Sequence, residues 1–207
     1  MGSTPVALLV MVALFSAQLA QAQGDPEAGE AQATPCAACH GPNGAEPING
    51  TYPVLAGQNA TYMTRQLELI QSGERPVPEM GGQLDGKSQQ DLEDLAAYFA
   101  AQDDVVGAAA GDDDALATAQ SIYRGGILEK DVAACTSCHS PTGNGNAPAG
   151  FPDISGQPVD YTIAQLTAYR EGERTTDEQY GRMMRNVAGR LTDTEIEMLA
   201  NYLRGLH

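Results

Sequence analysis

The chain has 207 residues, with 27 acidic and 11 basic side chains and a formal net charge of −16. That length allows one large or two small domains, and a field of that sign disfavours nucleic acid and anionic membrane surfaces as partners. It suits solubility and docking onto basic proteins, although adaptation to a salty or alkaline habitat would produce the same balance.

The first segment has the pattern of a secretory signal. Residues 5–19 are almost wholly apolar, and Ala20–Ala22 offers small residues where a signal peptidase cleaves. No basic residue precedes the apolar run, so an uncleaved membrane anchor is the alternative, but the run is shorter than the roughly 20 residues that a span needs. We therefore predict a signal peptide at 1–22 and an exported mature chain without a later membrane-spanning stretch.

Helical patterns dominate the first half of the mature chain. We expect a short helix at 26–33, and a helix at 60–72 that Asn59 caps and Gly73 ends. A last helix opens at Ser88, and its apolar residues recur at helical spacing.

The second half repeats this order after a stretch of small and acidic residues. A helix is expected at about 115–123, and Pro158 suits the first turn of a helix at 159–171, which Gly172 ends. Thr192 and Glu195 form a capping box for the last helix. Period-2 alternation is absent over any useful length, so the pattern predicts an all-α fold.

All four cysteines lie in two copies of the pattern Cys-x-x-Cys-His, the attachment signature of c-type haem. Two thiols one helical turn apart can reach the two vinyl-bearing edges of one porphyrin, and the imidazole that follows then faces the iron. A thioredoxin-like redox pair or half a zinc site would explain a single Cys-x-x-Cys. Two copies, each followed by histidine, instead predict two covalently bound haem c groups. The attachment residues are Cys36, Cys39 and His40 in the first copy and Cys135, Cys138 and His139 in the second.

The two motifs belong to a longer internal duplication. A shift of 99 residues aligns Pro53 with Pro152, Gln58 with Gln157, Tyr62 with Tyr161, Gln66 with Gln165, and Arg75 with Arg174. Later the offset becomes 104, which indicates a five-residue insertion in the second half. We predict an N-terminal domain at 23–101, an exposed acidic linker at 102–114 and a C-terminal domain at 115–207. At this size core burial alone is marginal, and a haem would supply much of the missing apolar core.

Elimination narrows the sixth ligand of each iron. The motifs use two of the three histidines and His207 is the last residue, so both haems cannot have two histidine ligands. Methionine is the remaining soft, neutral ligand, and His/Met ligation raises the haem potential. Met80, in a loop rich in Pro and Gly, is the predicted ligand of the first haem. The offset of 104 places Met184 opposite Met80, with Met183 as the alternative.

Repeated polar residues are further candidates for contact with the haems. The carbonyl oxygens of Pro53 and Pro152 could accept the Nδ1–H of the axial histidines, although simple turn prolines are the alternative. Candidate hydrogen-bond donors to the haem propionates are Tyr62, Tyr161, Arg75 and Arg174. A packing or helix-terminal role would explain their repetition nearly as well.

With these residues in place the chain resembles the cytochrome c4 family, which is built from two class I c-type cytochrome domains. The resemblance rests on the two haem motifs, on the segments 53–58 and 152–157, on Met80 and on the Met183–Met184 pair. It implies two tandem class I cytochrome c-like domains with His/Met haems related by pseudo-twofold symmetry, their propionates facing one another. It also implies a periplasmic carrier, free or loosely membrane-associated, in a respiratory chain. Its partners would be a donor such as a quinol-oxidising complex and an acceptor such as a terminal oxidase.

The predicted function is therefore one-electron transfer and not enzymatic catalysis, because six-coordinate iron leaves no position for a substrate. One alternative is the haem subunit of a larger oxidoreductase, such as a flavocytochrome sulfide dehydrogenase, which sequence separates poorly from a free carrier. A dihaem peroxidase is the other, and it would need a displaceable ligand and a distal histidine that the chain does not offer.

Overall fold

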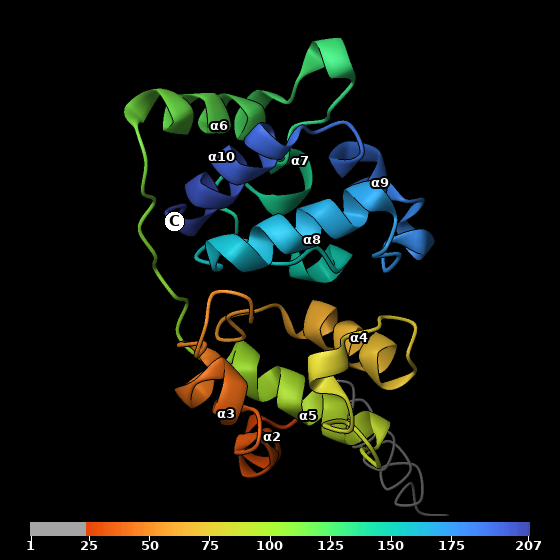
Figure 1. Cartoon of the computed structure of the whole chain (residues 1–207). Helices are drawn as coiled ribbons and strands as arrows, with labels where there is room; N and C mark the ends of the chain where they lie inside the picture. The colour runs from red at the N-terminus through yellow and green to blue at the C-terminus, as the bar shows by residue number, and fades with distance from the viewer. Residues whose placement is uncertain (1–23) are drawn as a thin grey trace, which may run out of the picture.

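The computed structural model describes residues 24–207, and the signal peptide predicted at 1–22 lies outside them. The described residues form helices joined by turns and loops, with two isolated β-bridges and no strand, as the helical patterns predict. The helices gather into two halves, one above the other, with an extended segment running along one side (Figure 1). No helix in the described part is long and apolar enough to cross a membrane.

The N-terminal half is built around its last helix. Its elements are α2 (Pro26–Ala33), α3 (Ala37–His40), η1 (Pro42–Gly44), α4 (Ala60–Gln71), η2 (Pro78–Met80) and α5 (Gln89–Ala100). Helix α5 begins in a capping box in which Ser88 and Asp91 bind each other's backbone N–H. It packs against α2 and α4 and buries Leu95, Ala96 and Phe99 in the core of this half.

The C-terminal half repeats this plan. Its elements are α6 (Asp113–Gly125), η3 (Leu128–Lys130), α7 (Thr136–His139), η4 (Ala147–Ala149), α8 (Val159–Glu171), η5 (Glu178–Tyr180), α9 (Met183–Ala188) and α10 (Asp193–Arg204). The capping box of Thr192 and Glu195 opens α10 as predicted. Helix α10 packs against α6 and α8, with Ile196, Leu199 and Leu203 in the core. Helix α9 has no helical counterpart in the first half and lies in the region of the five-residue insertion.

Two local expectations differ from the structure. Asn59 occupies the N-cap position of α4, but its side chain makes no cap; its Nδ2 donates to Phe151 O at 2.7 Å, in the other half of the molecule. Helix α6 starts at Asp113 and not near 115, because the Asp112 side chain accepts from Ala115 N at 2.8 Å. The acids at 112–114 therefore form a helix start, where negative charge is favourable.

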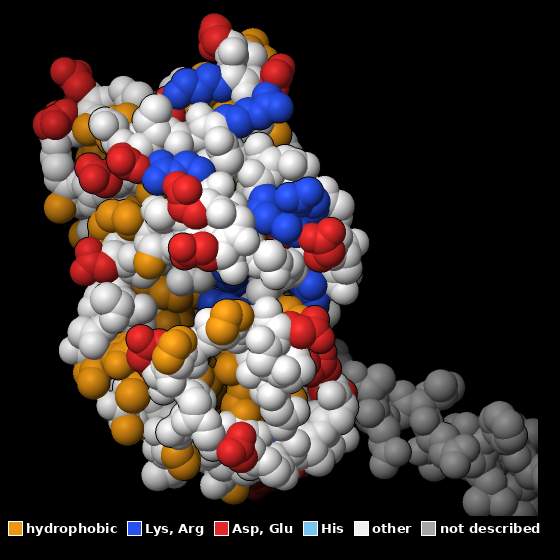
Figure 2. Space-filling model, turned by 45° about the vertical axis from the view of Figure 1, so that its right-hand side comes forward, with side chains coloured by type: hydrophobic (Ala, Val, Ile, Leu, Met, Phe, Trp, Pro, Cys, Tyr) orange, Lys and Arg blue, Asp and Glu red, His pale blue; other side chains and the backbone are white. Residues whose placement is uncertain are grey.

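Charge is distributed unevenly between the halves. Residues 24–100 carry eleven acidic and three basic side chains, and residues 115–207 carry eleven acidic and eight basic ones. Figure 2 shows Lys and Arg gathered mainly on the upper, C-terminal half of the visible face. Every ion pair found among residues 24–207 also lies in that half. The acids of the N-terminal half are thus free of basic side-chain partners within the described part of the chain.

Candidate haem sites

Each Cys-x-x-Cys-His motif forms a single helical turn. The first cysteine occupies the N-cap of α3 or α7, and the backbone N–H of the histidine donates to that cysteine's carbonyl at 2.9 Å in both copies. The two cysteines and the histidine of each motif thus lie within one short helix and its N-cap. All four cysteines are free of disulfides and partly buried. The two cysteines of each motif are about one helical turn apart, the spacing on which the haem-attachment signature rests.

Both motif histidines are buried, with 7% of His40 and 6% of His139 exposed. His40 Nδ1 lies 2.9 Å from Pro53 O, and His139 Nδ1 lies 3.0 Å from Pro152 O, the contacts expected for these prolines. Because a carbonyl oxygen only accepts, Nδ1 carries the proton in both rings. Nε2 is then the unprotonated nitrogen that can bind iron.

Burial also sets the protonation of these side chains. It lowers the pKa of both imidazoles, against the opposing effect of the proline carbonyls, and so favours the neutral form that ligates a metal. Burial raises the pKa of the Cys135 thiol to about 11. It also raises the pKa of the Cys36 thiol above its ordinary value. Reactive dithiols and zinc sites need thiolates, so these microenvironments do not favour either alternative.

A polar cluster from both halves is buried where they meet. Arg174 Nη2 donates to Tyr62 OH at 2.8 Å and to Gln66 Oε1 at 3.0 Å, both in the other half. Arg75 reciprocates, with Nη2 donating to Gln165 Oε1 at 3.2 Å and to Tyr161 OH at 3.5 Å. The duplication therefore places equivalent residues on either side of a pseudo-twofold axis.

This cluster carries positive charge that no described side chain neutralises. Arg174 is 7% exposed, and neither Arg75 nor Arg174 has a carboxylate within ion-pair distance among residues 24–207. Burial would raise the pKa of Tyr161, but the two guanidinium groups hold it below its ordinary value. Gln66 Nε2 is buried without a partner. One buried and one half-buried arginine, with an orphaned donor beside them, call for an anionic acceptor. Haem propionates have that chemistry, so these residues fit the group.

The candidate methionine ligands differ in exposure. Met80 ends η2 and is half-buried. Met184, the second residue of α9, is also half-buried, whereas its neighbour Met183 is 41% exposed. The equivalent enclosure of Met80 and Met184 favours this pair, and their role as ligands stays a prediction.

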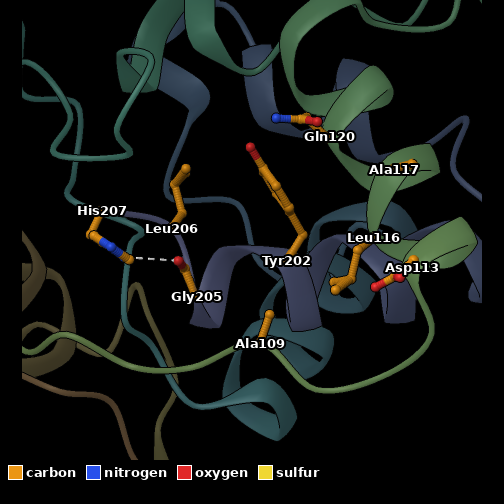
Figure 3. A pocket seen from close by; sticks show the side chains of 9 residues that line it. All are labelled: Ala109, Asp113, Leu116, Ala117, Gln120, Tyr202, Gly205, Leu206 and His207. Carbon is orange, nitrogen blue, oxygen red and sulfur yellow. Dashed lines mark hydrogen bonds between the residues drawn. The ribbon is translucent and has the colours of Figure 1, made fainter.

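The third histidine, His207, follows α10 as the last residue of the chain. His207 lines a pocket of about 390 Å³ between α6 and the end of the chain around α10 (Figure 3). Its Nδ1 donates to Gly205 O at 3.0 Å, and the side chain is exposed. No residue of either haem motif lines this pocket.

Two buried glutamines at equivalent positions of the duplication, Gln58 and Gln157, have no role predicted from the sequence. Each is 7% exposed and binds the backbone of the other half. Their repetition at the 99-residue offset is the signal that could have identified them.

Two helical halves, each with a haem-attachment turn and a proline-bound histidine, define a two-domain c-type cytochrome. The sequence model described as Cytochrome c matches residues 26–102 and 111–207. Cytochrome c4 of Azotobacter vinelandii is 44% identical over 198 residues, which cover 91% of this chain and 92% of that protein. The crystal structure of reduced recombinant cytochrome c4 from Pseudomonas stutzeri has a TM-score of 0.84 and 44% identity, covering 89% of this chain and 100% of that one. This chain belongs to the cytochrome c4 family.

It follows that the chain is a dihaem electron carrier with two covalently bound haem c groups, one at each motif. A more distant relative is the thiosulfate dehydrogenase electron acceptor of Stutzerimonas stutzeri (strain A1501). It is 31% identical over 198 residues, which cover 93% of this chain and 90% of that protein.

Proposed function

We propose that this chain is a periplasmic one-electron carrier of a respiratory chain, which accepts electrons from a quinol-oxidising complex and passes them towards a terminal oxidase. The observation that carries the proposal is the hydrogen-bonded interface between the two haem sites. The peptides that follow Pro53 and Pro152, each bound to an axial histidine, both lie in this interface. Such proximity favours electron exchange between the haems as well as with partners.

In this proposal a histidine and a methionine of each domain would bind the haem iron of that domain and leave it no free position. The ligands are His40 and Met80 in the first domain and His139 and Met184 in the second, with thioether bonds at Cys36, Cys39, Cys135 and Cys138. Haem supplies the one-electron chemistry, and the chain supplies attachment, burial and tuning. A closed iron has no position for peroxide, so the carrier is favoured over a dihaem peroxidase.

The chain's own residues hold each site in one arrangement. The Nδ1–H bond to proline keeps the imidazole plane fixed and raises its basicity as a ligand. Burial of both histidines excludes water from the ligand, and the two arginines supply positive charge at the domain interface. These features support rapid gain and loss of an electron with little rearrangement.

Stopped-flow mixing of the ferrous holoprotein with membranes that contain terminal oxidases tests the proposal. We expect both haems to be oxidised in an oxygen-dependent reaction that cyanide blocks, and to be reduced again when quinol and a quinol-oxidising complex are added. Failure of oxidase-containing membranes from the source organism to oxidise the protein would contradict the respiratory role.

A second candidate function is that of electron acceptor for a thiosulfate-oxidising enzyme, which the relative that is 31% identical supports. In that case a purified thiosulfate dehydrogenase and thiosulfate would reduce the ferric protein faster than the quinol-oxidising complex does. A further experiment distinguishes both carrier functions from that of a flavocytochrome subunit. The protein is purified from native membranes and periplasm, and a flavoprotein that co-purifies with it would indicate the subunit.

A further inference from the structure

The peptide groups that bind the axial histidines are each held by a side chain of the opposite domain. In the first domain, Pro53 O accepts from His40 Nδ1 at 2.9 Å. The N–H of the same peptide group belongs to Val54 and donates to Gln157 Oε1 at 3.0 Å. Gln157 Nε2 in turn donates to Val54 O at 3.0 Å. A continuous hydrogen-bonded path thus runs from His40 through one peptide group to a side chain of the second domain.

The second domain has the same path in the opposite direction. Pro152 O accepts from His139 Nδ1 at 3.0 Å, and the N–H of that peptide, on Asp153, donates to Gln58 Oε1 at 3.0 Å. Gln58 Nε2 donates to Asp153 O at 2.8 Å. Both glutamines are buried, so water does not replace these bonds. Two equivalent crossed paths are difficult to explain as chance packing.

Amide resonance connects the two ends of each peptide group. When the N–H donates a hydrogen bond, electron density moves towards the carbonyl oxygen, which becomes a stronger acceptor. A stronger acceptor draws the Nδ1 proton of the histidine and makes its Nε2 more electron-donating to iron. More donation stabilises the ferric form over the ferrous form and lowers the reduction potential.

We propose that Gln157 tunes the haem of the first domain and Gln58 tunes the haem of the second, each acting across the domain interface through the peptide that binds the axial histidine. Both are positioning residues, since neither touches the iron ligand directly. The proposal rests on His40 and His139 as iron ligands and is independent of the donor and acceptor. Docking of the two domains then helps to set both potentials.

The test uses the holoprotein with Gln157→Met and Gln58→Met as a matched pair. Methionine keeps the length of the side chain and removes the acceptor. Haem-methyl NMR resonances, assigned to each domain, report the two potentials separately during a redox titration. We expect Gln157→Met to raise the ratio of reduced to oxidised first-domain haem about threefold at fixed applied potential, or about 28 mV for a one-electron couple. The second-domain haem stays unchanged, and Gln58→Met gives the reverse pattern.

Gln157→Glu separates polarisation from packing. A carboxylate still accepts from the N–H of Val54, so the first-domain potential should stay at or below that of the unaltered protein. If loss of packing alone were responsible, Gln157→Met and Gln157→Glu would change the first-domain reduction potential in the same direction. The proposal is overturned if a substitution changes the reduction potential of the haem in the domain that carries the substituted glutamine. It is also overturned if both potentials change equally or if neither changes.

A second measurement needs no variant. In the diamagnetic ferrous holoprotein, scalar coupling across the hydrogen bond should connect the Val54 amide nitrogen with the Gln157 side-chain carbonyl carbon, and Asp153 with Gln58. Absence of both couplings overturns the proposal even if the variants fail to take up haem. Optical spectra of His/Met type in all variants show separately that the axial ligands are intact.

Discussion

At the scale of single residues, burial and one hydrogen bond decide what each motif histidine can do. His40 and His139 are enclosed, and a proline carbonyl accepts their Nδ1 protons, so Nε2 is left for iron. We propose a methionine as the second protein ligand of each iron. Here the chain offers two adjacent candidates in the second domain, and their different exposure leads to a sharp prediction.

Met184→Leu is expected to remove the sulfur ligand of the second haem. The ferric protein should lose about half of the weak long-wavelength absorption band that reports methionine ligation, and one of its two haems should become high-spin. Met183→Leu is the matched control, because Met183 is 41% exposed and we assign it no ligand role. Loss of the band in Met183→Leu, with Met184→Leu unaffected, would reverse the assignment. Ferric optical and EPR spectra of both holoproteins measure this.

At the scale of elements, the helix starts are where side chains have the clearest local effect. The last helix of each half opens with a capping box, at Ser88 in α5 and at Thr192 in α10. Each box satisfies backbone N–H groups that the helix leaves unpaired. In α10 the capping carboxylate of Glu195 also pairs with Lys130 at 2.7 Å, which ties α10 to η3. These helices form most of the core, so their starts affect the stability of each half.

Thr192→Ala should lower the free energy of unfolding of the C-terminal domain by about 1 kcal/mol, the usual cost of losing an N-cap side chain. Thr194→Ala in the same turn is the control, since Thr194 is exposed and makes no cap bond. Guanidinium chloride unfolding of the holoprotein, followed by circular dichroism, gives the comparison. Equal destabilisation by the two substitutions would show that the cap bond contributes nothing.

At the scale of the whole molecule, charge distinguishes the two halves. The C-terminal domain pairs many of its acids with its own cations, whereas no acid of the N-terminal domain has an ion-pair partner in residues 24–207. Unpaired charge produces the stronger external field and steers oppositely charged proteins during encounter. A basic redox partner should therefore approach the N-terminal domain first.

Two exposed glutamates at equivalent positions of the duplication, Glu74 and Glu173, allow this to be tested. Glu74→Lys should slow electron transfer to a small basic acceptor protein by on the order of twofold at low ionic strength. Glu173→Lys should have a smaller effect, and added salt should remove the difference, because it screens exposed charges. Stopped-flow rates across a salt series measure both. Equal slowing by the two variants would mean that the domains do not differ in docking.

The sequence by itself determined the features that depend on neighbouring residues. The haem-attachment turns, the capping box of α10, the glycine that ends α8 and the internal duplication all involve positions within a few residues or a fixed repeat. Their physical causes, helix geometry and local hydrogen bonding, act over one or two turns. That is why the all-α fold and both haem motifs could be predicted without coordinates.

Only the tertiary structure decided which residues work across the domain interface. Asn59 leaves its helix cap to bind Phe151 O, 92 residues away, and Gln157 reaches the peptide of Val54 over 103 residues. The arginine, tyrosine and glutamine cluster likewise needs both halves. Such partners depend on how two folded surfaces dock, and a buried polar group takes whichever partner that docking supplies. Local sequence therefore specifies each haem site, and domain docking specifies how the two sites influence each other.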